Sequence, residues 1–484
     1  MGERPIVKRT LFFCIFSKGG QSMESMANMF GRNIITTDIT DLNNDNILDE
    51  LKDAMTDHLV NRAKIEYLWD YYRGKQPILE RTKTVRPEIC NKIVENRANE
   101  IVSFKVGYLC GEPIQYVGRN ANESISKAIS ELNEMMFSEN KASQDKKLVE
   151  WQMICGTSYR LVLPDKILDE DDAPFEMFTL DPRDTFVVYS NDVGGKPKYA
   201  VKYCTDKKGI NTYSVYTYNH YWEIKDREIL VDRPHSLGMI PIFEYPANTA
   251  RLGAFEIVLD LLDEINNISS NRMDGIEQFV QAFMKFINCD ISKEEYEAFL
   301  QLGAIKVKST DGTNADVDMV SNELNQSQTQ VTKDDVYNAI LTICGMPNRN
   351  GGSSTSDTGA AVILRDGWSA AETRAKDSEL MFKESEQNVL KLILRIIRDT
   401  RGLSQEIYKL RLKDIELRFT RRNYDNIQSK SQVLDTMLKN PKIHPKLAFA
   451  GCGMFPDAEA AYLASMEYYK ENSQPIEEPT ITEK

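Results

Sequence analysis

Side chains that could perform chemistry are few and scattered in this 484-residue sequence. A nucleotide-dependent motor needs a glycine, four residues and then Gly-Lys-Ser/Thr, whose amides and lysine neutralise phosphates. That motif is missing, because Gly74-Lys75 and Gly195-Lys196 are followed by glutamine and proline. The four histidines do not have the paired spacing of a zinc hydrolase either; they are His58, His220, His235 and His444. The sequence therefore carries no recognisable nucleotide or zinc motif.

Carboxylates offer another route to a metal-dependent reaction. Asp316 and Asp318 could together hold a metal ion, and the acidic run 169–172 could attract a cation. Acids in a polar loop or a charged turn are usually solvated, however, so neither pattern predicts a metal site. The eight cysteines occur singly, which argues against a zinc ribbon and indicates reduced thiols. We expect no catalytic residue, no metal and no cofactor, and a structural or interaction protein rather than an enzyme.

A Gly- and Ser-rich loop, 345–357, is the most distinctive polar segment. A Gly- and Ser-rich loop beside a long rigid helix suggests a mechanical part more than a catalytic pocket. Two long helical patterns must position the loop. From 361 to 396 apolar or small residues recur in steps of three and four, small at first and large later. A second rod is predicted from 253 to 283, and a shorter helix, 333–344, leads back into the loop.

The rest of the chain is predicted to be α+β and predominantly helical. Helical spacing covers 47–72, 89–102 and 124–155, whereas 158–245 has short runs rich in Tyr, Val and Thr that indicate antiparallel strands. The apolar run 11–16 is too short for a signal peptide core or a membrane span. We expect the N-terminal segment to be partly disordered and no membrane association.

The net charge of −13 also restricts the function. Proteins that coat nucleic acid bind through Lys and Arg, which release phosphate counterions, so an acidic chain is not expected to act in that way. An acidic wall is nevertheless compatible with a protein through which DNA slides, because like charge prevents a polyanion from adhering. On its own, the acidic balance is better explained by its contribution to solubility.

Taken together, the segments resemble the portal proteins of tailed bacteriophages, in particular those of long-tailed phages of Gram-positive bacteria. The resemblance covers roughly residues 60 to 470. It rests on the paired-tyrosine helix end 71–78, the turn 107–114 with its Tyr-hydrophobic-x-Gly-x-Pro pattern, the strand 240–245 before the first rod, and the later motifs 417–423 and 455–459.

The resemblance implies a portal-type fold in which wing, stem, clip and crown follow in order. The expected parts are a partly disordered N-terminal segment 1–46, a wing 47–252, a first stem helix 253–285, a clip 286–322, a second stem helix 323–345, a tunnel loop 346–357, a long wing-to-crown helix 358–401, a crown 402–472 and a disordered tail 473–484.

It also implies a ring of about twelve subunits at one capsid vertex, through which double-stranded DNA is packaged and ejected. Expected partners are the terminase large subunit, the major capsid and scaffolding proteins and head-completion or adaptor proteins. The protein would be located in the virion, at the portal vertex of the capsid, after assembly in the host bacterial cytoplasm.

Three sets of residues are expected to serve this role. The DNA-facing tunnel loop would use Asn348, Arg349, Asn350, Gly351, Gly352, Ser353 and Ser354. Candidates for an acidic channel wall are Glu256, Asp260, Asp263, Glu264 and Asp274, each of which could equally face solvent or a neighbouring subunit. Clip contacts with partners would come from Lys306, Lys308 and Asp311.

Two other functions stay open at this point. One is another head-to-tail connector ring without a packaging role, although such connectors are usually shorter and lack two rods around a small insertion. The other is a metal-dependent nuclease, which would depend on Asp316 or Asp318.

Overall fold

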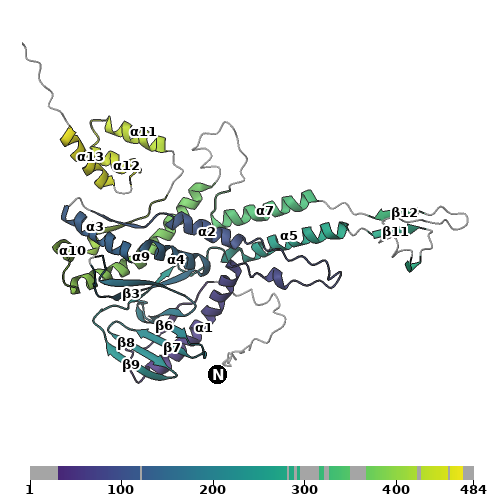
Figure 1. Cartoon of the computed structure of the whole chain (residues 1–484), viewed down its shortest axis with the longest axis horizontal. Coiled ribbons are helices and arrows are strands. Elements are labelled where there is room, and N and C mark those ends of the chain that lie inside the picture. Colours follow the sequence, from purple (N-terminus) through teal and green to yellow (C-terminus); the bar gives the residue numbers. More distant parts are fainter. Residues whose placement is uncertain are drawn as a thin grey trace, which may run out of the picture.

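The structure is a computed structural model of the chain, and it describes ten stretches: 31–119, 123–169, 171–280, 283–287, 292–294, 316–320, 326–348, 367–421, 427–455 and 458–472. Figure 1 shows a mixed body of helices and strands, a pair of helices that projects from it, and a small cluster of helices at the opposite end. This architecture agrees with the predicted α+β class.

The helical elements in chain order are α1 (Ile47–Tyr72), η2 (Pro77–Glu80), α2 (Arg97–Cys110), α3 (Glu123–Ser138), α4 (Lys141–Cys155), η3 (Glu256–Val258), α5 (Leu259–Val280), α7 (Gln326–Cys344), α9 (Trp368–Asp399), α10 (Gln405–Lys409), η4 (Leu412–Asp414), α11 (Ile427–Leu438), α12 (Pro445–Gly451) and α13 (Ala458–Asn472).

The strands are β1 (Ile35–Thr37), β2 (Gln115–Gly118), β3 (Thr157–Pro164), β4 (Phe175–Leu180), β5 (Thr185–Ser190), β6 (Pro197–Thr205), β7 (Asn211–Tyr216), β8 (His220–Lys225), β9 (Glu228–Pro234), β10 (Ile242–Pro246), β11 (Phe283–Ile287), β12 (Asp316–Val320) and β13 (Ile415–Arg418).

Two sheets dominate the body. One has six strands in the order β1-β5-β6-β7-β8-β9, and it is antiparallel except for β1, which runs parallel to β5. The other has three antiparallel strands in the order β10-β3-β4. Helix α1 covers the larger sheet, because Ile47 and Leu51 share a core with Phe186 and Val201. The antiparallel region expected for 158–245 is therefore confirmed.

The main core forms around α9. Seven positions of the predicted seam are buried: Ala371, Ala375, Phe382, Ser385, Val389, Leu392 and Ile396. Trp368 and Ser378 of the seam are half-buried. The large members of this seam join one core with residues of α1, α2, α3, α4 and α5. Helix α9 thus belongs to the centre of the body, since three- and four-residue steps keep one stripe facing inward.

Several expected boundaries differ from those observed. Residues 31–46 include β1, so the ordered body begins before residue 47. Helix α5 ends at Val280, and Phe283 of the predicted rod opens β11 instead. Helix α9 begins at Trp368 after Gly367, whose φ of 81° a right-handed helix does not accept. The earlier part of that predicted helix lies outside the described residues.

The expected crown boundary also moves. Strand β13 pairs antiparallel with β2, with Leu417 opposite Tyr116, and α10 packs on α3. Residues 402–421 therefore belong to the body. Helices α11, α12 and α13 pack on one another, and Figure 1 shows them as a separate cluster.

Candidate functional site at the base of the projecting helices

Helices α5 and α7 form the projecting pair. They lie side by side in Figure 1, and the antiparallel strands β11 and β12 continue them at the far end. Near the body the pair is held by apolar contacts, since Ile265 of α5 and Ile340 and Leu341 of α7 belong to the main core. Farther from the body the described side chains of the pair are mostly polar, although Met273, Ile276 and Val331 are exposed among them.

A strap, residues 81–96, runs along α5 without helix or strand structure. Side chains of α5 at helical spacing satisfy its backbone. Asn266 Oδ1 accepts from the N–H of Glu95 at 2.8 Å, Ser270 Oγ accepts from that of Ile93 at 3.0 Å, and Asp274 accepts from that of Asn91 at 2.7 Å. An irregular segment without such partners would leave buried polar groups unpaired, so this polar stripe is what fixes the strap.

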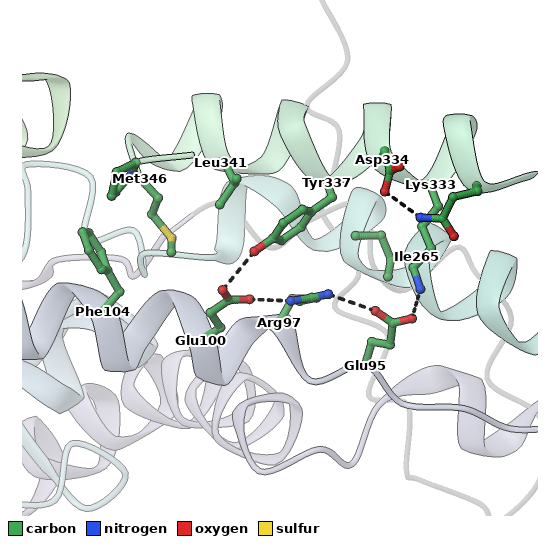
Figure 2. A pocket seen from close by; sticks show the side chains of 12 residues that line it. Glu95, Arg97, Glu100, Phe104, Ile265, Lys333, Asp334, Tyr337, Leu341 and Met346 are labelled. Carbon is green, nitrogen blue, oxygen red and sulfur yellow. Dashed lines mark hydrogen bonds and ion pairs between the residues drawn. The ribbon is translucent and has the colours of Figure 1, made fainter. Parts of the chain in front are cut away.

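A cavity of about 330 Å³ opens where the strap and α2 meet the projecting pair. Figure 2 shows the chain of contacts that crosses it. Lys333 of α7 pairs with Glu95, and Arg97 links Glu95 to Glu100 at 3.3 and 2.9 Å. Tyr337 donates to Glu100 at 2.9 Å, and the Arg97 guanidinium lies 4.3 Å from the Tyr337 ring centroid. Helix α7 is thus fastened to the body through charged groups.

The charges of Glu95 and Arg97 stabilise the attachment of α7 to the body. Burial alone would raise the pKa of Glu95, but the hydrogen bonds from Lys333 and Ser269 outweigh burial and lower it. Burial opposes the charge of Arg97 as well, yet its bond to Glu100 raises the pKa of the guanidinium. Both groups are therefore charged at neutral pH. Among the described lining residues, Glu95, Glu100 and Asp334 each have a hydrogen-bond or ion-pair partner, and the contacts of Glu95 and Glu100 hold α7 to the body.

Two of the five acids expected at a channel wall have another role. Glu256 is buried, pairs with Arg32 and accepts the N–H of Gly31 at 3.0 Å. Asp274 is buried beneath the strap, where Lys83 and Arg81 neutralise it. Their charge is compensated inside the subunit, so the expectation of free wall charges is corrected for these two.

The other three acids lie nearer the surface. Asp260 and Glu264 are exposed, while Asp263 is half-buried and accepts from Tyr71 at 2.8 Å. Burial raises the pKa of Asp263 to about 6, and the nearby Asp260 adds to the increase, although the Tyr71 bond opposes it. One flank of α5 therefore does present carboxylates.

Most of the expected loop and clip residues lie outside the described part of the chain: Arg349, Asn350, Gly351, Gly352, Ser353, Ser354, Lys306, Lys308 and Asp311. Asn348 is described; its amide donates to Asn338 of α7 at 3.1 Å. The loop thus leaves from the C-terminal end of α7, beside the cavity.

The structure also places the residues that were considered for metal binding. Asp316 and Asp318 lie in β12, opposite Ile287 and Lys285 of β11, and not in an irregular loop. His58 is buried against Phe186, and burial lowers its pKa to about 4, so it is a neutral packing residue. Within the described ranges no group of three or more His, Cys, Asp or Glu could hold a metal ion. In the same ranges no helix is long and apolar enough to span a membrane.

Sequence reasoning missed a buried cluster of four charges. Glu386 of α9 accepts from Arg160 of β3 at 2.9 Å and pairs with Lys141 of α4 at 3.2 Å. Asp145 pairs with both cations, and all four side chains are at most 4% exposed. The available signal was Arg160 directly before the apolar run Leu161-Val162-Leu163 of β3, since a charge buried there requires a partner.

Comparison with known proteins identifies the family of this chain. A family model described as "Phage portal protein, SPP1 Gp6-like" matches residues 51–476. The portal protein of Bacillus phage SPP1 is 23% identical over 288 residues, which are 52% of this chain and 53% of that protein. The chain thus spans about half the length of this curated relative. Because the family model covers most of the sequence, the chain belongs to the SPP1 Gp6-like family of phage portal proteins.

Proposed function

We propose that the chain forms a ring-shaped channel at one vertex of a phage capsid, through which double-stranded DNA is packaged and later ejected. Membership of the portal family over residues 51–476 carries this proposal. The projecting pair supports it, because an elongated part fastened to a rigid body suits a tube wall built from repeated subunits. A closed ring of identical subunits needs two different complementary flanks on each copy.

Within this proposal the parts have distinct roles. The projecting pair is the stem, 286–322 is the clip and 346–357 is the tunnel loop. Helices α11 to α13 form the crown, while residues 31–258 and 367–421 form the wing together with the long helix α9. The clip would contact partners through Lys306, Lys308 and Asp311.

The channel surface combines repulsion with a few contacts. Asp260, Asp263 and Glu264 on one flank of α5 would present negative charge, which prevents a polyanion from adhering. The loop would contribute Asn348, Arg349, Asn350, Gly351, Gly352, Ser353 and Ser354, whose amides, hydroxyls and guanidinium suit phosphate oxygens. Such a channel wall would allow DNA to move past it without binding the DNA tightly.

The ring would assemble from about twelve copies in the host bacterial cytoplasm and would then lie at the portal vertex of the virion. Its partners would be the terminase large subunit, the major capsid and scaffolding proteins, and head-completion or adaptor proteins. The energy for packaging would come from the terminase, in accord with the missing phosphate-binding motif.

The oligomer tests the proposal directly. Twelve copies of the 55.3 kDa chain amount to roughly 664 kDa, which native mass spectrometry separates from eleven or thirteen copies. Negative-stain images should show a ring whose channel, about 20 to 40 Å wide, admits a duplex. A small closed dimer would contradict the proposal.

A deletion tests the loop separately. Removal of Gly351 to Ser354 should leave ring assembly intact, because these small Gly and Ser residues have no apolar side chain to contribute to a core, but DNA filling of capsids should fall. Capsids that fill normally with this variant would remove the loop from the proposal.

A further inference from the structure

A pair of cations lies where α2, α9 and the end of α7 meet. Lys105 of α2 and Arg374 of α9 line a small cavity of about 30 Å³ together with Gly345. Gly345 has a φ of 64°, and a Cβ there would lie 2.3 Å from Arg374 Cδ, so the arginine side chain packs directly over this turn. Lys105 is half-buried and Arg374 is exposed. The site is therefore built by the fold and open on one side.

Neither cation has an ion pair or a side-chain hydrogen bond with any residue that the structure describes. Two acids on the same stretch of α9 have another partner, since Arg421 binds Glu372 at 2.9 Å and also pairs with Glu379. A third acid, Asp377, is exposed on this helix. The thiol beside Lys105 supplies no charge, because burial raises the pKa of Cys344 to about 11. Two like charges thus line one cavity, and among the described residues neither has an ion-pair partner.

This arrangement differs from the treatment of other cations in the body. Arg160 and Lys141 have carboxylates at 2.9 and 2.6 Å, and Arg251 has one at 2.6 Å. Burial and the neighbouring Arg374 both lower the pKa of Lys105, which expresses the cost of a cation that lacks a partner. A bound anion would remove that cost.

We propose that Lys105 and Arg374 form a binding site for a phosphate group. A guanidinium binds phosphate oxygens with two parallel N–H bonds, and a lysine ammonium adds a point charge. The exposed Arg374 provides the entry, and Lys105 lies at the inner side. The site adjoins Gly345 to Asn348, where the chain enters the loop 346–357.

Two sources could supply the phosphate: the backbone of duplex DNA, or free inorganic phosphate. The choice of duplex DNA as the source rests on the function proposed above, since DNA in the channel would pass the loop. The phosphate chemistry itself does not rest on it.

The test uses the full-length protein and the variants Arg374→Gln and Lys105→Met. Lys376→Gln is the matched control, because Lys376 is exposed on the same helix and already pairs with Glu372 at 3.6 Å. One arm measures fluorescence anisotropy of a labelled duplex of about 30 base pairs between roughly 50 and 200 mM salt. The other arm measures Tm with inorganic phosphate at constant ionic strength.

For the duplex, each variant should bind about tenfold more weakly, and the slope of log affinity against log salt should shrink by about 0.9 for each phosphate that the variant no longer neutralises. The control should bind as the unmodified protein does. If phosphate instead raises Tm of the unmodified protein but not of the variants, while duplex affinity is unaffected, the site takes a free anion and DNA as the source is overturned. If the unmodified protein and all variants give the same duplex affinity and the same Tm response to phosphate, the proposed phosphate site is overturned.

Two further measurements keep these outcomes interpretable. Lys105→Arg preserves the charge and should restore binding, whereas a purely structural role for the amine would not predict that rescue. Native mass spectrometry of the same samples reports the ring. A ring without phosphate binding refutes this inference alone, and phosphate binding without a ring refutes the proposed function alone.

Discussion

Replacing Glu386 by Gln should destabilise the body strongly. Glu386 lies in α9, is fully buried and accepts from Tyr116 at 2.6 Å, from Tyr245 at 2.5 Å and from Arg160 at 2.9 Å. A glutamine keeps one acceptor but removes the charge, which leaves Arg160 and Lys141 opposite Asp145 alone. An uncompensated buried charge costs about 3 to 5 kcal/mol in the free energy of unfolding.

The expected change in melting temperature follows from the size of the body. Unfolding entropy of about 2.1 cal/mol/K per residue gives roughly 0.6 kcal/mol/K for a cooperative unit of about 300 residues, so Tm should fall by roughly 5 to 8 °C. Calorimetry at pH 7 measures this, with Glu384→Gln as the control, because Glu384 is exposed on the same helix. A Tm for Glu386→Gln within about 1 °C of the control would refute the reasoning.

The same cluster predicts a pH dependence. Burial alone would raise the pKa of Glu386, but Lys141 and Arg160 outweigh burial and lower it below its usual value of 4.5. A lowered carboxyl pKa in the folded state stabilises the protein above the unfolded pKa, and this stabilisation is lost as pH falls. The Tm difference between the unmodified protein and Glu386→Gln should therefore be full at pH 7 and shrink below about pH 4.5. A difference that stays constant down to pH 3 would contradict the ionised cluster.

Three further changes test other parts of the structure. Asp263→Asn should raise stability by about 1 kcal/mol at pH 7.5, because the raised pKa of Asp263 means that its ionisation costs folding energy above about pH 4, and the gain should vanish at pH 3.5 in thermal scans. Asp274→Ala should lower the free energy of unfolding by about 2 to 4 kcal/mol, since Lys83 and the N–H of Asn91 lose their partner. Hydrogen exchange or proteolysis of the strap should become faster, and an unchanged digestion pattern would contradict the role of Asp274 in holding the strap. Gly156→Ala should cost more than about 3 kcal/mol, because its Cβ would lie 2.0 Å from the Arg251 carbonyl oxygen at a φ of 78°, whereas Gly209→Ala, with a φ of 82° and no close atom, should cost about 1 kcal/mol by urea denaturation.

The sequence predicts elements whose stabilising contacts are periodic. The α9 seam from Ala371 to Ile396 and the strands between 158 and 245 were recognisable, because each buries one face at a regular interval. Strand β1 was missed because Ile35–Thr37 has three residues, too few to define a period, and its partner β5 lies about 150 residues away. The end of α5 was misplaced since Phe283 continues the helical spacing although it pairs in β11.

Site residues were harder to predict for the same physical reason. The charge on Glu256 or Asp274 is visible in the sequence, but its partner, Arg32 or Lys83, is about 190 to 225 positions away and is set only by tertiary packing. Lys105 and Arg374 likewise come together because α2 and α9 pack near the turn at Gly345. Local patterns do not specify such pairs.

The pairing of β11 with β12 has a consequence for how this chain can change. Phe283 pairs with Val320 and Ile287 with Asp316, so the intervening segment enters and leaves at one point beyond the projecting pair. Loop closure entropy grows only slowly with length, and an insertion there has no core residue of the body to displace. The hairpin turns of the larger sheet, such as 206–210 between β6 and β7, share this property. Helix α9 does not, because it packs in one core with α2, α3 and α4, which precede it by more than 200 residues. Recombination between related genes should therefore exchange the tip more freely than α9 and the helices around it.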